Sequence, residues 1–134
     1  MQRHSRLTGS KRFAQLHREG RSTANQLLVI RILANGLDVS RFGFLVSKRI
    51  GNAVVRNRVK RRLREVARLS QVKPGWDVVF IARRGTEAAN YQQLKQAADN
   101  LFRRTNLVVG AGKGEREALT SRTVAEHPGG VPQI

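Results

Sequence analysis

The fold is decided by the stretch from residue 41 to residue 82, which reads RFGFLVSKRIGNAVVRNRVKRRLREVARLSQVKPGWDVVFIA. Its two ends, residues 41–47 and 76–82, are mostly apolar and rich in aromatic and β-branched side chains, which is typical of strands. Between them, Asn52 is a suitable N-cap for a helix that extends to about Ser70. The stretch therefore predicts a strand, a long helix and a second strand.

The residues before this stretch predict one helix and one more strand. A short helix over residues 10–19 ends at Gly20, and residues 27–33 are mostly apolar and predict a strand. The Asn35-Gly36 pair that follows favours a hairpin turn. We therefore expect this strand to pair with the strand over residues 41–47.

The residues after the stretch predict a final helix. It begins near Asn90, with which Gln93 completes a capping box. Its apolar stripe at helical spacing consists of Tyr91, Leu94, Ala97, Ala98, Leu101 and Phe102. The order α-β-β-α-β-α indicates an α+β fold, a sandwich in which the helices pack on a small mixed sheet.

The net charge restricts the class of partner. The 134 residues include 26 Lys and Arg against 9 Asp and Glu, a formal net charge of +17. A small protein with this excess favours a polyanionic partner, which indicates nucleic acid, with anionic lipid as the weaker alternative. The chain has no cysteine, which excludes disulfides, thiolate zinc sites and cysteine nucleophiles.

The charge is confined to residues 1–106, which we expect to form a single domain. Residues 107–134 have no net charge, several glycines and little apolar periodicity, so they predict a disordered C-terminal tail. No apolar run is long enough to span a membrane, and no apolar signal core follows the N-terminus. We therefore expect a cytoplasmic protein with no membrane partner.

One side of the long helix is apolar and the remainder is basic. At about 100° per residue, Val55, Val59, Leu63 and Val66 form one narrow stripe. Glu65 is the one acidic residue of this helix, so its cations repel one another instead of forming i,i+4 pairs. Amides at the helix start and guanidinium groups both suit phosphate oxygens. The predicted nucleic-acid contacts are Lys48, Arg49, Asn52, Arg56, Asn57, Arg58, Lys60, Arg61, Arg62 and Arg64.

The patterns weigh against two other functions and leave a third open. A helix-turn-helix would need a helix just before the basic one, where a strand is predicted, so the commonest DNA-binding motif is disfavoured. A protein nuclease would need a carboxylate cluster or a positioned histidine pair, but the acidic residues are scattered along the domain. A ribosomal protein is the remaining alternative, because its composition is similar.

The run from Val46 to Arg61, VSKRIGNAVVRNRVKR, resembles the hallmark of the protein subunit of bacterial ribonuclease P. The resemblance extends over about residues 4–106. It implies a ribonucleoprotein in which a large RNA subunit removes the 5′ leader of precursor tRNA with Mg²⁺, while the protein holds no catalytic residue and no metal. The Arg-Asn-Arg helix would bind that RNA. The resemblance also implies a left-handed crossover around this helix, against the usual handedness rule.

The same resemblance implies a cleft between the first helix and the sheet that receives the single-stranded leader. Its candidate residues are Phe13, His17, Arg31 and Phe42. His17 and Arg31 stand where relatives often have an aromatic residue; His17 would meet RNA by stacking, and Arg31 by stacking or phosphate pairing. The alternatives are a partly buried histidine and an ordinary exposed cation of a strand. Phe13 and Phe42 also suit an apolar core.

Overall fold

The computed structural model describes residues 4–108. The elements in chain order are β1 (His4–Arg6), α1 (Ser10–Glu19), β2 (Arg21–Ala24), β3 (Leu28–Ala34), β4 (Ser40–Leu45), the 3₁₀ turn η1 (Lys48–Ile50), α2 (Ala53–Leu69), β5 (Trp76–Ala82), the 3₁₀ turn η2 (Thr86–Ala88) and α3 (Tyr91–Arg104). The three predicted helices and the three predicted strands are confirmed. The strands β1 and β2 were not predicted, because both are short and carry few of the apolar residues that indicate a strand.

The sheet has the strand order β1-β4-β5-β3-β2. The predicted pairing of β3 with β4 is therefore wrong, because β5 lies between them, antiparallel to β3 and parallel to β4. Asn35-Gly36 does reverse the chain, but the seven-residue strand β5 is inserted into the gap and pairs along the whole of β3. The mixed sheet of the predicted α+β fold is confirmed.

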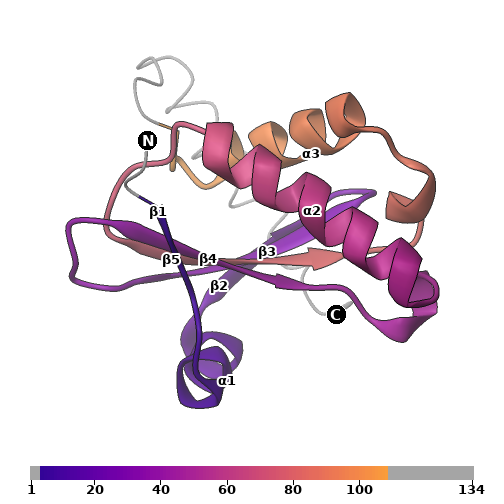
Figure 1. Ribbon diagram of the computed structural model, residues 1–134. Helices are drawn as coiled ribbons and strands as arrows, with labels where there is room; N and C mark the ends of the chain where they lie inside the picture. Colours follow the sequence, from indigo (N-terminus) through magenta and orange to yellow (C-terminus); the bar gives the residue numbers. More distant parts are fainter. Residues whose placement is uncertain (1–3, 109–134) are drawn as a thin grey trace.

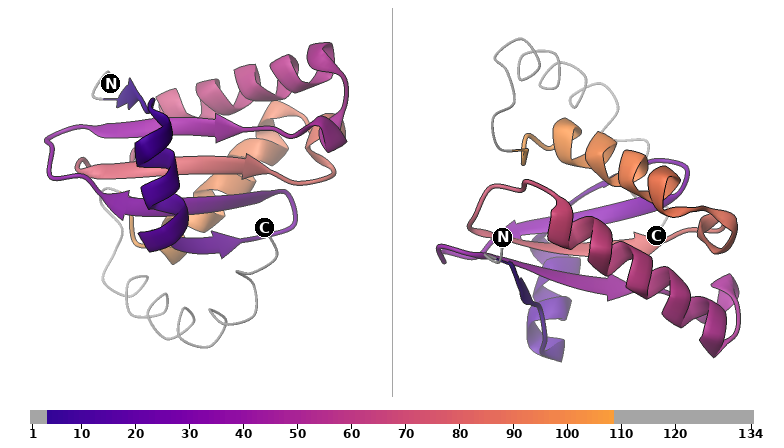
Figure 2. Two further views of the ribbon diagram at one scale, coloured as in Figure 1. Left: turned by 90° about the horizontal axis from the view of Figure 1, so that it is seen from below. Right: turned by 45° about the horizontal axis from the view of Figure 1, so that its top comes forward.

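The helices lie on both faces of the sheet. Figure 1 shows α2 and α3 on one face and α1 on the other. Seen from the α1 side with β4 and β5 pointing to the right (Figure 2, left), the chain leaves β4, returns behind the sheet through α2 and enters β5 below β4. This path is a left-handed crossover, as the family resemblance implied.

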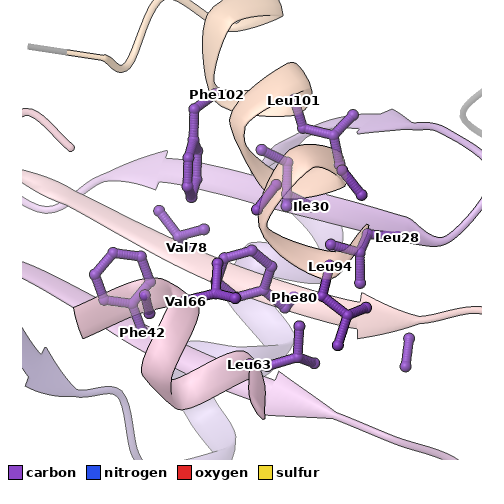
Figure 3. Close-up of a cluster of buried hydrophobic side chains, with 14 of the residues drawn as sticks. Leu28, Ile30, Phe42, Leu63, Val66, Val78, Phe80, Leu94, Leu101 and Phe102 are labelled. Carbon is purple, nitrogen blue, oxygen red and sulfur yellow. The ribbon is translucent and has the colours of Figure 1, made fainter. Parts of the chain in front are cut away.

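The larger core lies between the sheet and the pair α2 and α3. The predicted stripe of α2 faces it, with Val59, Leu63 and Val66 fully buried. Phe80 is at its centre, in edge contact with Phe102 (Figure 3). It is also stacked on Phe44. Asn90 and Gln93 form the predicted capping box of α3. This core therefore fixes α2 by one side only and leaves the rest of its surface outside.

A smaller apolar cluster holds α1 on the opposite face. Its buried members are Leu7, Leu16 and Val79, and Phe13, Leu33 and Ile81 pack on them partly buried.

The first two residues of the predicted tail, Leu107 and Val108, belong to the folded domain. Leu107 is 1% exposed within the larger core, and Val108 pairs with Val72. A single apolar residue after a helix gives no periodic signal, so the sequence pattern did not reveal it. The rest of the predicted tail, residues 109–134, lies outside the described residues.

Candidate nucleic-acid interface

The start of α2 is built by a glycine and an asparagine. A Cβ on Gly51 would lie 2.8 Å from Cβ of Val55, so only glycine lets η1 turn this closely into the helix. Asn52 then caps the helix as predicted, with its Oδ1 accepting from the Val55 amide at 3.0 Å. This oxygen is engaged in the cap, which makes Asn52 first a structural residue. The turn sets Lys48 and Arg49 beside the first turn of α2.

The predicted cations of η1 and α2 form two groups. Two of them bind carbonyls of η2 and its end: Arg62 donates to Ala89 O at 2.8 Å, and Arg58 reaches Glu87 O at 3.5 Å. These two arginines brace the segment before α3. Among the residues that the structure describes, the others engage no side-chain hydrogen bond or ion pair. We call this second group the α2 cation surface; it consists of Lys48, Arg49, Arg56, Lys60, Arg61 and Arg64.

The one acidic residue of α2 does not neutralise this surface. Glu65 pairs with Arg68 in the last turn of the helix at 2.6 Å, and the hydrogen bond from Arg68 lowers the pKa of Glu65. Asn57, which is exposed, lies between Arg56 and Arg58 and adds an amide to the same stretch. The surface thus offers phosphate-binding groups over several turns of one helix.

On the other face, the sheet register arranges side chains in rows beneath and beside α1. Residues Gly43, Val79 and Arg31 are neighbours across β4, β5 and β3. Phe13 lies over the first of them: a Cβ on Gly43 would lie 2.7 Å from Cζ of its ring. Only glycine therefore allows the ring to sit this close to the strand.

The next row lies beside α1. It consists of Leu45, Ile81 and Val29, which are neighbours in the register. Val29 is 2% exposed and Ile81 packs partly buried on the α1 cluster, so the row is open mainly at Leu45; we call Leu45 and Ile81 the open row. Leu45 is 47% exposed, and alternation along β4 directs it to the α1 side together with Gly43. Exposed His17 lies one helical turn after Phe13 on α1. An apolar strip bordered by an aromatic ring and an imidazole suits the faces of unpaired bases.

One of the four predicted cleft residues lies on the other face of the sheet. Phe42 is wrong as a cleft residue: it is 3% exposed in the larger core on the opposite face, stacked on Phe80 at 6.0 Å. Alternation along β4 explains the error, because Phe42 and Phe44 face α2 while Gly43 and Leu45 face α1. This alternation was present in the sequence and would have identified Leu45 and Gly43.

Arg31 is on the expected face, but it binds protein. Its guanidinium donates to Leu16 O at 3.1 Å, to Ser22 Oγ at 2.6 Å and to His17 O. Burial lowers its pKa. It therefore holds the end of α1, and the alternative of an ordinary exposed strand cation is wrong.

The described residues include no group of three or more His, Asp or Glu side chains that could hold a metal ion. Within the same part of the chain, no helix is both long and apolar enough to cross a bilayer.

The crossover helix with its cation surface, set on a small mixed sheet, defines a class of protein, a nucleic-acid-binding α+β domain. The ribonuclease P family model matches residues 1–106. The ribonuclease P protein component of Alkaliphilus metalliredigens is 41% identical over 110 residues, which are 81% of this chain and 99% of that protein. The chain therefore belongs to the ribonuclease P protein family.

A second relative and two solved structures support the same family. The protein component of Clostridioides difficile is 42% identical over 100 residues, 72% of this chain and 88% of that protein. The solved structure of the RNase P protein from Thermotoga maritima superposes with a TM-score of 0.67 at 30% identity, covering 72% of this chain and 94% of that one. The protein from Staphylococcus aureus superposes with a TM-score of 0.69 at 28% identity over 76% and 95%.

The protein is thus an RNA-binding component of the ribonuclease P ribonucleoprotein, an endoribonuclease involved in 5′ processing of precursor tRNA. Its partner is the RNase P RNA. Membership of this family decides against the alternative of a ribosomal protein.

Proposed function

We propose that the protein binds two RNAs on opposite faces: the RNase P RNA on the α2 cation surface, and the single-stranded leader of precursor tRNA along the open row beside α1. The observation that carries the first part is the concentration of six unengaged cations, among the described residues, on one helix and the turn before it. Side chains cannot read the deep groove of an A-form duplex, so an arginine-rich helix binds such an RNA by its backbone and shape.

The second part rests on the surface between Phe13, His17 and Leu45. Its apolar strip suits bases, while duplex RNA presents mainly phosphates and hydroxyls there. Unpaired nucleotides are therefore the RNA that this face fits. Phe13 and His17 are its proposed contact residues from α1, and Leu45 and Ile81 those from the sheet. Precursor tRNA would then be a direct partner of the protein.

Mg²⁺ is assigned to the RNA subunit in this proposal. The described residues do not form a cluster suited to the ion. The contribution of this chain to a reaction that uses Mg²⁺ is the neutralisation of RNA phosphates by the α2 cation surface. Because its substrate and its RNA partner are made in the cytoplasm, we place the protein there and not at a membrane.

The α2 cation surface is tested by salt-dependent binding of the full chain to the RNase P RNA. Arg61→Ala and Arg64→Ala should each weaken binding and flatten the dependence of log affinity on log salt by about 0.7 to 0.9 per lost phosphate contact. Arg68→Ala is the matched control, because Arg68 is engaged by Glu65 at 2.6 Å. Unchanged affinity and slope for both test variants would show that these arginines are only solvated.

The leader surface is tested by comparing precursor tRNA, with a leader of several nucleotides, and mature tRNA. Phe13→Leu and His17→Ala should weaken binding of the precursor about five-fold or more, since one stacked base contributes about 1 to 3 kcal/mol, and should leave mature tRNA unchanged. A thermal melt of each variant controls for loss of structure. Equal losses for both tRNAs would reject the leader surface.

A further inference from the structure

Helix α1 is held on the sheet by polar contacts at both of its ends in addition to a small apolar cluster. That cluster has three buried members, Leu7, Leu16 and Val79. In Figure 2 (left), α1 crosses β4, β5 and β3 at a steep angle. One polar contact lies on the side away from the open row, and the other lies beneath the last turn of the helix.

The first contact is the Asp77 clamp, in which Arg12 of α1 reaches a buried carboxylate of β5. Arg12 Nε donates to Asp77 Oδ2 at 2.6 Å, and the Asp77 side chain is 0% exposed. Arg41 of β4 binds both oxygens of the same carboxylate, at 2.8 Å and 2.7 Å, and Asn35 donates to Oδ1 at 2.9 Å. Arg12 also donates to Ala34 O at 3.1 Å. The carboxylate is therefore oriented by the sheet and presents a fixed partner to α1.

The second contact is the Arg31 clamp. Arg31 of β3 donates to two carbonyls in the last turn of α1, Leu16 O and His17 O, and to Ser22 of β2. A guanidinium at this place adds a donor to carbonyls of the helix end, where partners within the helix run out; Leu16 O also accepts from the Gly20 amide at 2.9 Å. The three acceptors fix the end of α1, and with it His17, relative to two strands.

The row that contains Asp77 and the open row lie on opposite sides of α1. In the register, Arg41 and Asp77 precede Gly43 and Val79, over which α1 lies, and Leu45 and Ile81 follow them. The Asp77 clamp thus holds the helix toward the row of Arg41 and Asp77 and away from Leu45, which is 47% exposed. Burial of apolar surface favours the opposite shift, in which α1 would slide over Leu45 and the part of Ile81 that the α1 cluster leaves exposed.

We propose that Arg12, with Asp77, and Arg31 are positioning residues for leader recognition: the two clamps keep α1 from covering the open row and so hold the leader surface open. This inference rests on the proposed function for its consequence, but the position of α1 itself is independent of any RNA. Neither arginine needs to touch the leader. A shift of about 1 Å in such a site is sufficient to impair a contact that depends on stacking.

The position of α1 is tested first, without RNA. The chain has no cysteine, so Leu45→Cys in the full chain gives one thiol whose labelling rate by a small maleimide reports the exposure of the open row. Adding Arg12→Gln or the milder Arg31→Lys should lower that rate at least three-fold. Lys11→Ala, which removes one charge from the exposed surface of α1, should not change it. An unchanged or increased rate with both clamp variants overturns the proposal.

The consequence is tested with the assembled holoenzyme and the native Leu45. Arg12→Gln and Arg31→Lys should each weaken binding of precursor tRNA about five-fold while mature tRNA stays within two-fold, a split that general loss of stability would not give. Lys11→Ala should leave both affinities within two-fold. Equal losses for the two tRNAs, or no loss, overturn the role of the clamps.

Phe13→Leu separates this inference from the proposed function. If Phe13→Leu weakens precursor binding and the clamp variants do not, the positioning role of the clamps is rejected and the proposed leader surface is retained. If the clamp variants lower cysteine labelling but neither they nor Phe13→Leu affect precursor binding, the leader surface itself is wrong and the positioning role in leader recognition is overturned with it.

Discussion

Asp77 is a carboxylate without solvent exposure that three side chains bind. Burial alone would raise its pKa, but the hydrogen bonds from Arg41, Asn35 and Arg12 outweigh that effect, and the net pKa lies below its ordinary value. A carboxyl group whose pKa is lowered by folding stabilises the folded state above the unfolded pKa of about 3.9. That contribution is lost as the pH falls through the lowered folded pKa.

We predict that Asp77→Asn lowers the free energy of unfolding by about 2 kcal/mol at pH 7, the order expected for hydrogen bonds to a charged group. The difference from wild type should shrink as the pH falls below about 4, because Asp77 is then protonated in the unfolded chain and, at lower pH, in the folded protein as well. Urea unfolding between pH 3 and pH 7 measures both quantities. A difference that is constant over this range would mean that the charge of Asp77 does not stabilise the fold.

Gly43 is the residue whose missing side chain makes room for Phe13. A methyl group in Gly43→Ala would meet Cζ and Cε1 of the ring at 2.7 Å and 3.0 Å, so the ring must move. The cost of crowding, about 1 kcal/mol or more, is offset in part by the gain of about 0.5 to 1 kcal/mol on replacing a strand glycine. We predict a small change in melting temperature but a several-fold loss of affinity for precursor tRNA. Unchanged precursor affinity would show that the position of Phe13 does not matter for RNA.

At the scale of elements, α2 combines a buried stripe with cations crowded at its N-terminus. The helix dipole disfavours positive charge at that end, and no acidic residue lies in the first turn. The side chain of Asn52 is thus the local group that supports the first turn, through its 3.0 Å bond to the Val55 amide. Bound phosphate would stabilise the same end in the ribonucleoprotein.

We predict that Asn52→Ala lowers the free energy of unfolding by about 1 kcal/mol, the usual cost of a lost N-cap, and that Asn52→Asp restores most of it. Because a carboxylate would also repel RNA phosphates, Asn52→Asp should bind the RNase P RNA more weakly than Asn52→Ala. Chemical unfolding and RNA titration of the three proteins test this. Equal RNA affinity of both variants would place Asn52 away from the phosphates.

At the scale of the whole molecule, the sheet separates a large core from a small one. The core with α2 and α3 includes the end of α3 and Leu107, which is 1% exposed and whose carbonyl accepts from the backbone amide of Lys73 at 2.7 Å. The face with α1 depends on fewer apolar side chains and on the two clamps. The helix proposed to bind the RNase P RNA is therefore held by a large apolar core, whereas the helix proposed to bind the leader is held by a small apolar cluster and by polar contacts.

We predict that a chain ending at residue 108 folds and binds the RNase P RNA within two-fold of the full chain, since residues 109–134 have three basic and three acidic residues and thus no net charge. A chain ending at residue 104 should lose about 2 to 4 kcal/mol of stability, because it lacks the buried Leu107. Unfolding curves and RNA titrations of the two truncations measure this. Equal stability of the two truncated chains would show that burial of Leu107 does not stabilise the fold.

Much of this protein was predictable from local patterns. The helical spacing of Val59, Leu63 and Val66 identified the buried side of α2, and the cap at Asn52 identified where it begins. The basic remainder of α2 and its motif identified the family. These features are local because helix faces, caps and charge repulsion depend on residues within one or two turns of each other.

The features that local patterns did not reveal involve residues far apart in the chain. The insertion of β5 between β3 and β4 depends on which strands meet, and the burial of Leu107 depends on the core that α2, α3 and the sheet form together. Both are set by the sum of long-range contacts. Arg31 and Asp77 looked like an exposed cation and a scattered acid, but Arg31 binds α1 carbonyls 14 and 15 residues before it, and Asp77 binds Arg12 across 65 residues. A charged group acquires its role from the partner that burial forces on it, and that partner has no local signature in the sequence.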